Sequence, residues 1–244
     1  MRRTRILVDA DLQAGERITL PESATRHLVK VLRLRSGQEF IAFDGRNPRE
    51  AVAVLEETGK KSATAKILAV TEVERESPLD LSLIQSISTT DKMDYALQKA
   101  VELGVKRIVP VWSERSQRRL KPAQVEKKLR HWQGVITHAT EQSGRTRLAT
   151  LEQPSSLEGH VAQRDRKTAA IVLAPDANIT LGDIEPPNRG MEIYIGPEGG
   201  FSKDELRMLA HAEVKPVRMG PRILRTETAG VAVLAWLQVQ FGDA

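Results

Sequence analysis

Two short segments in the last fifth of the chain combine glycine, proline and charged side chains in loops that could hold a ligand. The first is Ile195-Gly196-Pro197-Glu198-Gly199-Gly200, and the second runs from Met219 to Ala229. Each follows an apolar run typical of a buried strand, 191–195 and 214–219, and each leads into a helical pattern. Such loops lie at the carboxyl ends of parallel strands, and their glycines let a ligand approach the backbone, so we expect a ligand site there. Neither segment is a G-x-G-x-x-G or P-loop motif, so the ligand is not expected to be held by its phosphates.

The charged side chains of these loops are the candidates for catalysis. The guanidinium of Arg225 can stabilise a developing negative charge or bind a phosphate, and its alternative role is an ion pair with Glu198 or Glu227. The carboxylate of Glu198 can act as a base if it is desolvated. It can equally accept hydrogen bonds from the backbone N–H groups of its own loop. Both roles stay open for each residue.

The elements that must position these loops alternate between strands and helices after residue 78. Strands are predicted at 79–87, 106–112, 169–173 and 191–195, and helices at 91–103, 122–141, 203–212 and 227–240. Ser202 and Glu205 form a capping-box pattern for the third helix, and Thr226 is the predicted N-cap of the last. The stretch 153–166 has no clear period and is expected to be a connection. The alternation predicts an α/β domain with a parallel sheet over residues 78–244.

Residues 1–73 predict a small β-rich domain, joined to the second by a charged linker that ends at Pro78. Its short strands are expected at 5–8, 17–20, 39–43, 51–55 and 63–70. One helical pattern, 21–34, interrupts them. A regular helix there places His27, Lys30 and Arg33 on a basic face. It places Leu28, Val31 and Leu32 on an apolar face.

Positive charge is unevenly distributed along the chain. The net charge is +5, but residues 92–131 contain 11 Lys and Arg against 4 Asp and Glu, and the run 26–35 has no acid. Clustered positive charge indicates a polyanionic partner, and RNA fits, although a solvated helix face balanced by acids elsewhere gives the same pattern. The candidate RNA contacts are Arg26, His27, Arg33, Arg35, Arg115, Arg118 and Arg119. Arg222, in the second loop, either contacts RNA or packs that loop.

The composition narrows the class of protein. The chain has 244 residues, 40% of them hydrophobic and 28% charged, which is typical of a globular protein with ample core. No apolar run approaches the roughly 20 residues needed to span a bilayer. The absence of cysteine excludes disulfides and thiolate chemistry, so we expect a cytoplasmic protein. The 5 histidines show no metal-ligand spacing, and no metal is expected. Aromatic residues make up 4% of the chain, which favours RNA recognition by phosphate contacts and shape over stacking.

The two loops resemble those of the bacterial 16S rRNA uridine N3-methyltransferases of the SPOUT class. The resemblance is carried by I-G-P-E-G-G-F-S at 195–202 and G-P-R-I-L-R-T-E-T-A at 220–229. Further segments match in family order: Arg26-His27-Leu28 with 31–33, and the segments 99–105, 113–116 and 141–145. Together they extend over nearly the whole chain, so the resemblance rests on several spaced motifs.

The resemblance implies a PUA-like RNA-binding domain followed by a SPOUT domain whose C-terminal part ties a trefoil knot. It implies methyl transfer from S-adenosyl-L-methionine to N3 of a uridine in small-subunit rRNA. Arg225, in the second loop next to the expected cofactor, is then the first candidate for the transition-state role. It also implies that Arg145 approaches the target nucleotide. The expected cofactor contacts are Leu173, Pro175, Ile195, Gly196, Pro197, Gly199, Gly200, Met219, Gly220, Ile223, Leu224, Thr228 and Ala229.

Family members of this class are expected to be homodimers with the cofactor pocket beside the subunit interface. The terminal helix, with Val231, Leu234, Ala235, Leu237 and Val239, is the candidate contact, and its alternative is burial within its own domain. Two other functions remain open. One is a SPOUT enzyme that methylates another RNA atom, such as a ribose 2′-oxygen. The other is a non-catalytic rRNA-binding assembly protein.

Overall fold

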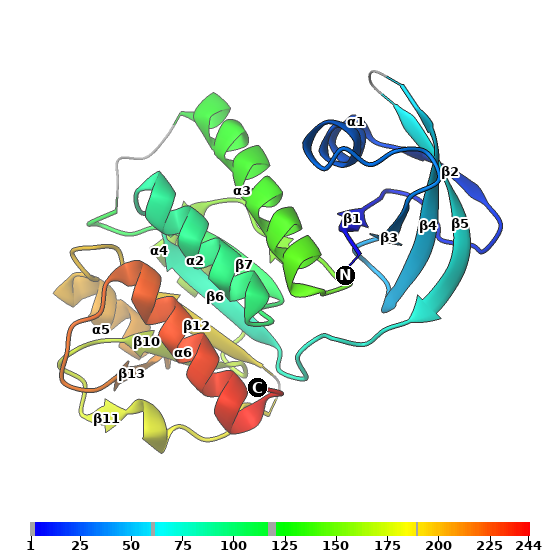
Figure 1. Ribbon diagram of the computed structural model, residues 1–244. Helices are drawn as coiled ribbons and strands as arrows, with labels where there is room; N and C mark the ends of the chain where they lie inside the picture. Colours follow the sequence, from blue (N-terminus) through cyan, green and yellow to red (C-terminus); the bar gives the residue numbers. More distant parts are fainter. Residues whose placement is uncertain (1–2, 60–61, 117–120, 189) are drawn as a thin grey trace. The chain divides into compact units, whose positions relative to one another are not determined.

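The computed structural model describes residues 3–59, 62–116, 121–188 and 190–244 (Figure 1). The chain forms two compact units. The first consists of Met1–Glu76 and Thr140–Leu148, and the second of Ser77–Ala139 and Ala149–Ala244. After entering the second unit, the chain thus returns to the first unit at residues 140–148. The domain ranges expected from the sequence, 1–73 and 78–244, are contiguous and contain no such return.

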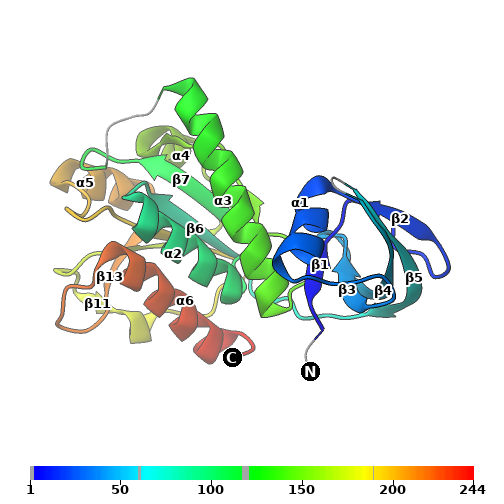
Figure 2. The same ribbon diagram turned by 45° about the horizontal axis from the view of Figure 1, so that its top comes forward.

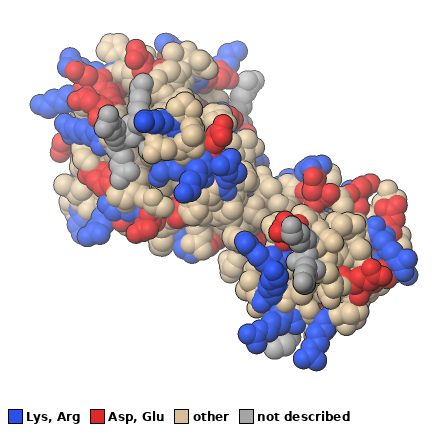
Figure 3. All heavy atoms as spheres, turned by 90° about the horizontal axis from the view of Figure 1, so that it is seen from above, with Lys and Arg blue, Asp and Glu red and all other residues tan. Residues whose placement is uncertain are grey.

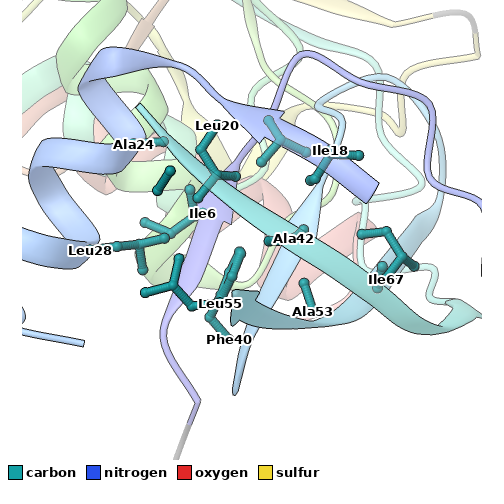
Figure 4. Packing of buried hydrophobic residues seen from close by; sticks show 14 of the residues in the cluster. Ile6, Ile18, Leu20, Ala24, Leu28, Phe40, Ala42, Ala53, Leu55 and Ile67 are labelled. Carbon is teal, nitrogen blue, oxygen red and sulfur yellow. The ribbon is translucent and has the colours of Figure 1, made fainter. Parts of the chain in front are cut away.

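The first unit is a curled five-stranded sheet. Its strand order is β1 (Arg5–Leu7), β3 (Glu39–Phe43), β4 (Arg49–Thr58), β5 (Ala63–Glu72) and β2 (Arg17–Leu20). Strands β1 and β3 are parallel, and the other pairs are antiparallel. Alternate residues of each strand face inward, and Figure 4 shows Ile6, Leu20, Phe40, Leu55 and Ile67 in the core that results. The β-rich domain expected from the sequence is confirmed.

The helical segment of the first unit differs from the expected regular helix. A short α1 (Glu22–Thr25) continues as the π-helix η1 (Arg26–Val31), in which the N–H of Leu32 donates to the carbonyl of His27 at 2.9 Å. The wider turn breaks the 3.6-residue period, so the expected apolar face is only partly correct. Leu28 is fully buried, whereas Val31 is 63% and Leu32 40% exposed.

The second unit is built on a parallel sheet in the order β11-β13-β10-β12-β6-β7-β8. These strands are Ile179–Thr180, Lys215–Arg218, Ala169–Leu173, Met191–Ile195, Leu81–Ser86, Arg107–Trp112 and Thr150–Leu151. The short β9 (Ser155–Ser156) also pairs with β7. Every residue of β6 and β12 is buried, as expected for central strands covered on both faces. The predicted parallel α/β fold is confirmed.

Helices cover both faces of this sheet (Figures 1 and 2). On one face α2 (Thr90–Glu102) packs against α6 (Thr226–Phe241). On the other, α4 (Leu157–Gln163) and α5 (Lys203–His211) share a core with β6, β7, β10 and β12. The long α3 (Pro122–Ser143) and the 3-10 turn η2 (Leu181–Asp183) complete the elements. In the described parts of the chain, no helix has the length and apolarity needed to cross a membrane.

Two local expectations in the second unit are wrong. The stretch 153–166 contains β9 and α4, with Ser156 as a cap that accepts a hydrogen bond from Gly159 N at 3.0 Å. Both elements are too short to show a period. Thr226 is not the N-cap of α6, because the helix begins at Thr226 and Arg225 occupies the cap position. The capping box of Ser202 and Glu205 is confirmed.

Candidate active site

A cavity of about 380 Å³ lies at the carboxyl ends of β10, β12 and β13 in the second unit. Because β10 pairs in parallel with both other strands, the loops that follow the three strands meet at one edge of the sheet. The cavity is lined by all but two of the predicted cofactor contacts: Leu173, Pro175, Ile195, Gly196, Pro197, Gly200, Met219, Gly220, Ile223, Leu224 and Ala229. The other two, Gly199 and Thr228, are not among its lining residues.

The first loop is tight enough to require glycine. A Cβ on Gly196 would lie 3.1 Å from the backbone N of Phe201 and 3.2 Å from Cα of Gly200. Gly200 has a φ of +65° and donates its N–H to the carbonyl of Pro197 at 2.9 Å. A side chain on Gly196 would therefore push the loop apart.

Thr226 connects the first loop to α6 and β6. Its hydroxyl donates to the carbonyl of Gly196 at 2.6 Å and accepts from Nε2 of Gln85 at 3.0 Å. Both side chains are buried, and Gln85 stands at the end of β6. This chain of hydrogen bonds explains why the Thr226 hydroxyl is not available as a helix cap.

Glu198 is held at the start of α2. Its carboxylate accepts a hydrogen bond from Nζ of Lys92 at 3.0 Å, and Lys92 also lines the cavity. Burial opposes ionisation, but hydrogen bonds from its own N–H, Lys92 and the N–H of Thr89 keep the pKa of Glu198 below its ordinary value. The arrangement makes Glu198 a carboxylate that stays ionised at neutral pH, and hence a weak base.

Arg225 and Arg222 line the cavity, and both are exposed. The carbonyl of Arg225 accepts hydrogen bonds from the N–H groups of Thr228 and Ala229, which fixes its backbone at the start of α6. Its guanidinium forms no ion pair with Glu198 or Glu227 in the structure as described, so it is available to a ligand. The positive charge needed next to a developing anion is thus present.

The cavity suits S-adenosylmethionine by volume and by chemistry. Ligand pockets are commonly about 300–1,000 Å³ and mostly apolar, with a few polar groups that fix orientation. Leu173, Ile195 and Leu224 supply the apolar wall that an adenine needs. Charged side chains of both signs also line the cavity, as a cofactor with a carboxylate and an amino group requires.

The predicted RNA contacts other than Arg145 and Arg222 fall into three groups. Arg26, Arg33 and Arg35 are exposed in the first unit and His27 is half-buried. In Figure 3, several Lys and Arg side chains, together with acidic ones, lie on the face of this unit that is turned to the viewer. In the second unit Arg115 is exposed but donates to the carbonyl of Gly199 at 2.8 Å, so it also shapes the first loop. Arg118 and Arg119 lie outside the described residues.

Arg145 is buried within the first unit. Its guanidinium donates to the carboxylate of Glu76 at 2.6 and 2.9 Å, and both side chains are only 5% exposed. The structure therefore commits this residue to an internal ion pair, which differs from the exposed position needed to approach a nucleotide.

Lys92 and Gln85 are functional candidates that lie outside both Gly/Pro loops. Lys92 was visible in the sequence only as the first residue of the basic segment 92–131. Gln85 is an isolated polar residue inside an apolar strand, and such a residue signals a specific hydrogen bond when it is buried.

Comparisons with known proteins agree with this architecture. Residues 75–238 match the family model of an RNA methyltransferase domain, and residues 20–68 match that of an RNA methyltransferase PUA domain. Ribosomal RNA small subunit methyltransferase E of Buchnera aphidicola is 33% identical, over 98% of this chain and 97% of its own. The Bacillus subtilis protein of the same name is 26% identical, with 96% and 94% covered.

Solved structures extend the likeness to three dimensions. A Legionella pneumophila protein solved in complex with the bound cofactor S-adenosylmethionine has a TM-score of 0.96 and 36% identity, with 100% of both chains covered. Ribosomal RNA small subunit methyltransferase E of Neisseria gonorrhoeae, also bound to S-adenosylmethionine, has a TM-score of 0.92 and 35% identity, with 99% of each chain covered. From its sequence, its fold and the loops around its cavity, the chain belongs to the ribosomal RNA small subunit methyltransferase E family.

Proposed function

We propose that this protein transfers a methyl group from S-adenosyl-L-methionine to N3 of a uridine in 16S rRNA. The observation that carries the proposal is the cavity at the carboxyl ends of β10, β12 and β13, which is lined by both Gly/Pro loops and by cationic side chains that include Arg225 and Lys92. The family membership supports the cofactor and the class of RNA. Such a reaction on ribosomal RNA takes place in the cytoplasm of a bacterium.

The reaction sets the task of the protein side chains. S-adenosylmethionine would supply an electrophilic methyl group and leave as S-adenosylhomocysteine when its bond from sulfur to methyl breaks. N3 becomes nucleophilic only as its proton leaves, and solvent water takes up that proton. Negative charge then spreads onto the two uracil carbonyl oxygens, and nearby cations lower the energy of that charge. Arg225 and Lys92 line the cavity and can supply them. Glu198 positions Lys92 through their 3.0 Å hydrogen bond and is not the base in this scheme.

The first unit is the proposed RNA-docking module, with its exposed Arg26, Arg33 and Arg35. Arg222, at the rim of the cavity, is the proposed contact to the target strand. Each exposed cation binds phosphate weakly by itself, and several together give salt-dependent affinity.

We also propose that the protein acts as a homodimer through α6. Residues 229–237 of the helix are all apolar, and beyond them Val239 is 62% exposed. Ile223 in the preceding loop is 83% exposed. A helix of this kind is stable in water when a partner covers its outer side. Val239→Glu should shift the protein from dimer to monomer in sedimentation equilibrium. A wild-type monomer at micromolar concentration would refute the dimer and leave the reaction untouched.

The direct test of the function is methyl transfer from labelled S-adenosylmethionine to small ribosomal subunits that lack the modification, followed by digestion to nucleosides. Label in 3-methyluridine supports the substrate and the target atom together. Label in a 2′-O-methylated nucleoside would keep the enzyme class and overturn the target atom. Absence of both label and cofactor binding would leave an rRNA-binding protein.

A further inference from the structure

Two large aliphatic side chains are exposed to solvent at the end of η1. Val31 is 63% exposed and Leu32 40% exposed. The neighbouring Lys30, Arg33 and Arg35 are also exposed. We call residues 30–35 the η1 tip. It thus combines two exposed aliphatic residues with cations that flank them in the sequence, and no acidic residue lies from 26 to 35.

The backbone of the η1 tip is strained in a way that its sequence does not relieve. Arg33 has a φ of +55°, a conformation that glycine adopts freely and that other residues adopt at a cost. The turn is closed by a 2.9 Å hydrogen bond from Leu34 N to the carbonyl of Leu28, the pattern of a helix end where glycine is usual. An arginine at this position places a long cationic side chain at the tip, but it leaves strain in the backbone that a glycine would relieve.

We infer that the η1 tip binds unpaired RNA, with Val31 and Leu32 against base or ribose faces and the cations on the flanking phosphates. This inference rests on the proposed function, because N3 lies on the Watson–Crick edge of uracil. A uridine methylated there must be unpaired, and its neighbours include bases whose faces are open to apolar contact. In a regular RNA duplex the base faces are stacked and give Val31 and Leu32 no partner.

Charge complementarity favours RNA over other occupants. A second copy of the chain would bring the same cations face to face in a two-fold contact, where they repel. A polyanion neutralises them, and its bases cover the aliphatic side chains. A single RNA ligand thus accounts for both the cations and the aliphatic side chains of the η1 tip.

The test compares two RNA probes of equal nucleotide count, a hairpin with an unpaired loop and a blunt duplex. The full-length double variant Val31→Ser, Leu32→Ser should lose about tenfold in affinity for the hairpin, since the apolar area buried amounts to about one side chain. Its affinity for the duplex and the slope of log K against log salt should not change. The matched control is Leu68→Ser, which removes an aliphatic side chain that is 44% exposed on β5 of the same unit.

A single variant tests the strained residue. Arg33→Gly should raise the melting temperature of the protein, because glycine relaxes the positive φ, and should reduce the salt slope by about one phosphate contact. A purely structural arginine would give the stabilisation with no change in RNA affinity, and that result would remove Arg33 from the interface.

The outcomes separate this inference from the proposed function. If wild-type protein binds neither probe and transfers no methyl group, the proposed function fails. If wild-type protein binds the hairpin and the double variant binds it equally well, only the η1 tip fails. An equal loss on hairpin and duplex would overturn the preference for unpaired RNA. Unchanged RNA affinity with reduced methylation of assembled subunits would assign the tip to a ribosomal protein instead.

Discussion

At the scale of single residues, Arg225 and Lys92 are cations on one cavity with different surroundings. Lys92 is 28% exposed and hydrogen-bonded to Glu198, whereas Arg225 is exposed with its backbone fixed at the start of α6. Lys92 is thus held in place by a partner before substrate arrives, whereas only the backbone of Arg225 is held. Loss of Lys92 and loss of Arg225 should therefore affect different steps of the reaction.

We predict that Arg225→Ala reduces methyl transfer by about 100-fold, the usual effect of removing one group that stabilises a developing oxyanion. Cofactor affinity and melting temperature should stay near the wild-type values, because the side chain is exposed and forms no ion pair with Glu198 or Glu227 in the described structure. Single-turnover rates and isothermal titration separate the two quantities. Turnover like that of the wild type would remove Arg225 from the mechanism.

Glu198→Gln distinguishes a positioning carboxylate from a base. The lowered pKa keeps Glu198 ionised, so the contact with Lys92 is present at neutral pH and is lost only as pH falls through that lowered pKa. We expect a rate within about tenfold of wild type and an unchanged pH–rate profile. Loss of a general base would instead cost about 10²–10⁴ in rate and remove one limb of the profile.

The residue roles follow unevenly from the sequence. The glycines and apolar residues of both loops were predictable, because their types are dictated by a close ligand and a buried strand end. The partners of charged residues were not. Pairings such as Lys92 with Glu198 and Arg145 with Glu76 join positions 106 and 69 residues apart, and only the folded chain selects them.

At the scale of elements, the first loop is held by hydrogen bonds from α6 and α2. Thr226 holds the carbonyl of Gly196, and Lys92 holds the carboxylate of Glu198. A cofactor that enters this loop meets a backbone already in place, which lowers the conformational entropy lost on binding. The loop should therefore be sensitive to substitutions that move its backbone.

We predict that Gly196→Ala weakens S-adenosylmethionine binding by at least tenfold, because the new Cβ meets backbone atoms of Gly200 and Phe201. Isothermal titration calorimetry measures the effect. Gly134→Ala in α3 is the matched control, since a Cβ there meets nothing within 4 Å and alanine favours a helix. Equal affinities in the two variants would show that the first loop tolerates a shift without loss of the cofactor.

Strong hydrophobic patterns predicted most elements well, and local hydrogen bonding explains the exceptions. Strands β2, β3, β10 and β12 have the predicted bounds. The helix 21–34 was mispredicted because a π-type turn leaves no sign in apolar periodicity. The elements β9 and α4 have 2 and 7 residues, too few for a period to stand out.

At the scale of the whole molecule, a buried charged network lies at the amino end of the parallel sheet, opposite the cavity. Glu192 accepts hydrogen bonds from Arg107, Arg164 and the hydroxyl of Tyr194. Nε2 of His160 lies 3.7 Å from the same carboxylate. Burial lowers the pKa of His160, although the carboxylate of Glu192 opposes the shift. The folded protein therefore favours neutral His160.

Because the pKa of His160 is lowered in the folded protein, the free energy of unfolding decreases as the pH falls. Above the unfolded pKa of about 6.5 neither state is protonated, and below it the unfolded chain takes up the proton first, so the free energy of unfolding decreases. We predict that the fall in melting temperature between pH 7.5 and 5.5 is about 2–4 °C smaller in His160→Gln, if the histidine contributes about 1 kcal/mol. His211→Gln, at an exposed histidine, is the matched control. An identical fall in all three proteins would assign the pH dependence to other groups.

The return of residues 140–148 to the first unit has a consequence for synthesis on the ribosome. Arg5 donates to the carbonyl of Arg145, and the N–H of Leu7 donates to Glu141. A nascent chain that has emerged only as far as Glu76 lacks these partners and the guanidinium that neutralises its own buried carboxylate. The N-terminal unit can reach its final stability only after α3 has left the exit tunnel. In most multidomain proteins the N-terminal domain completes its folding before the next domain is synthesised. The N-terminal unit of this chain cannot do so, because part of it is synthesised after α3.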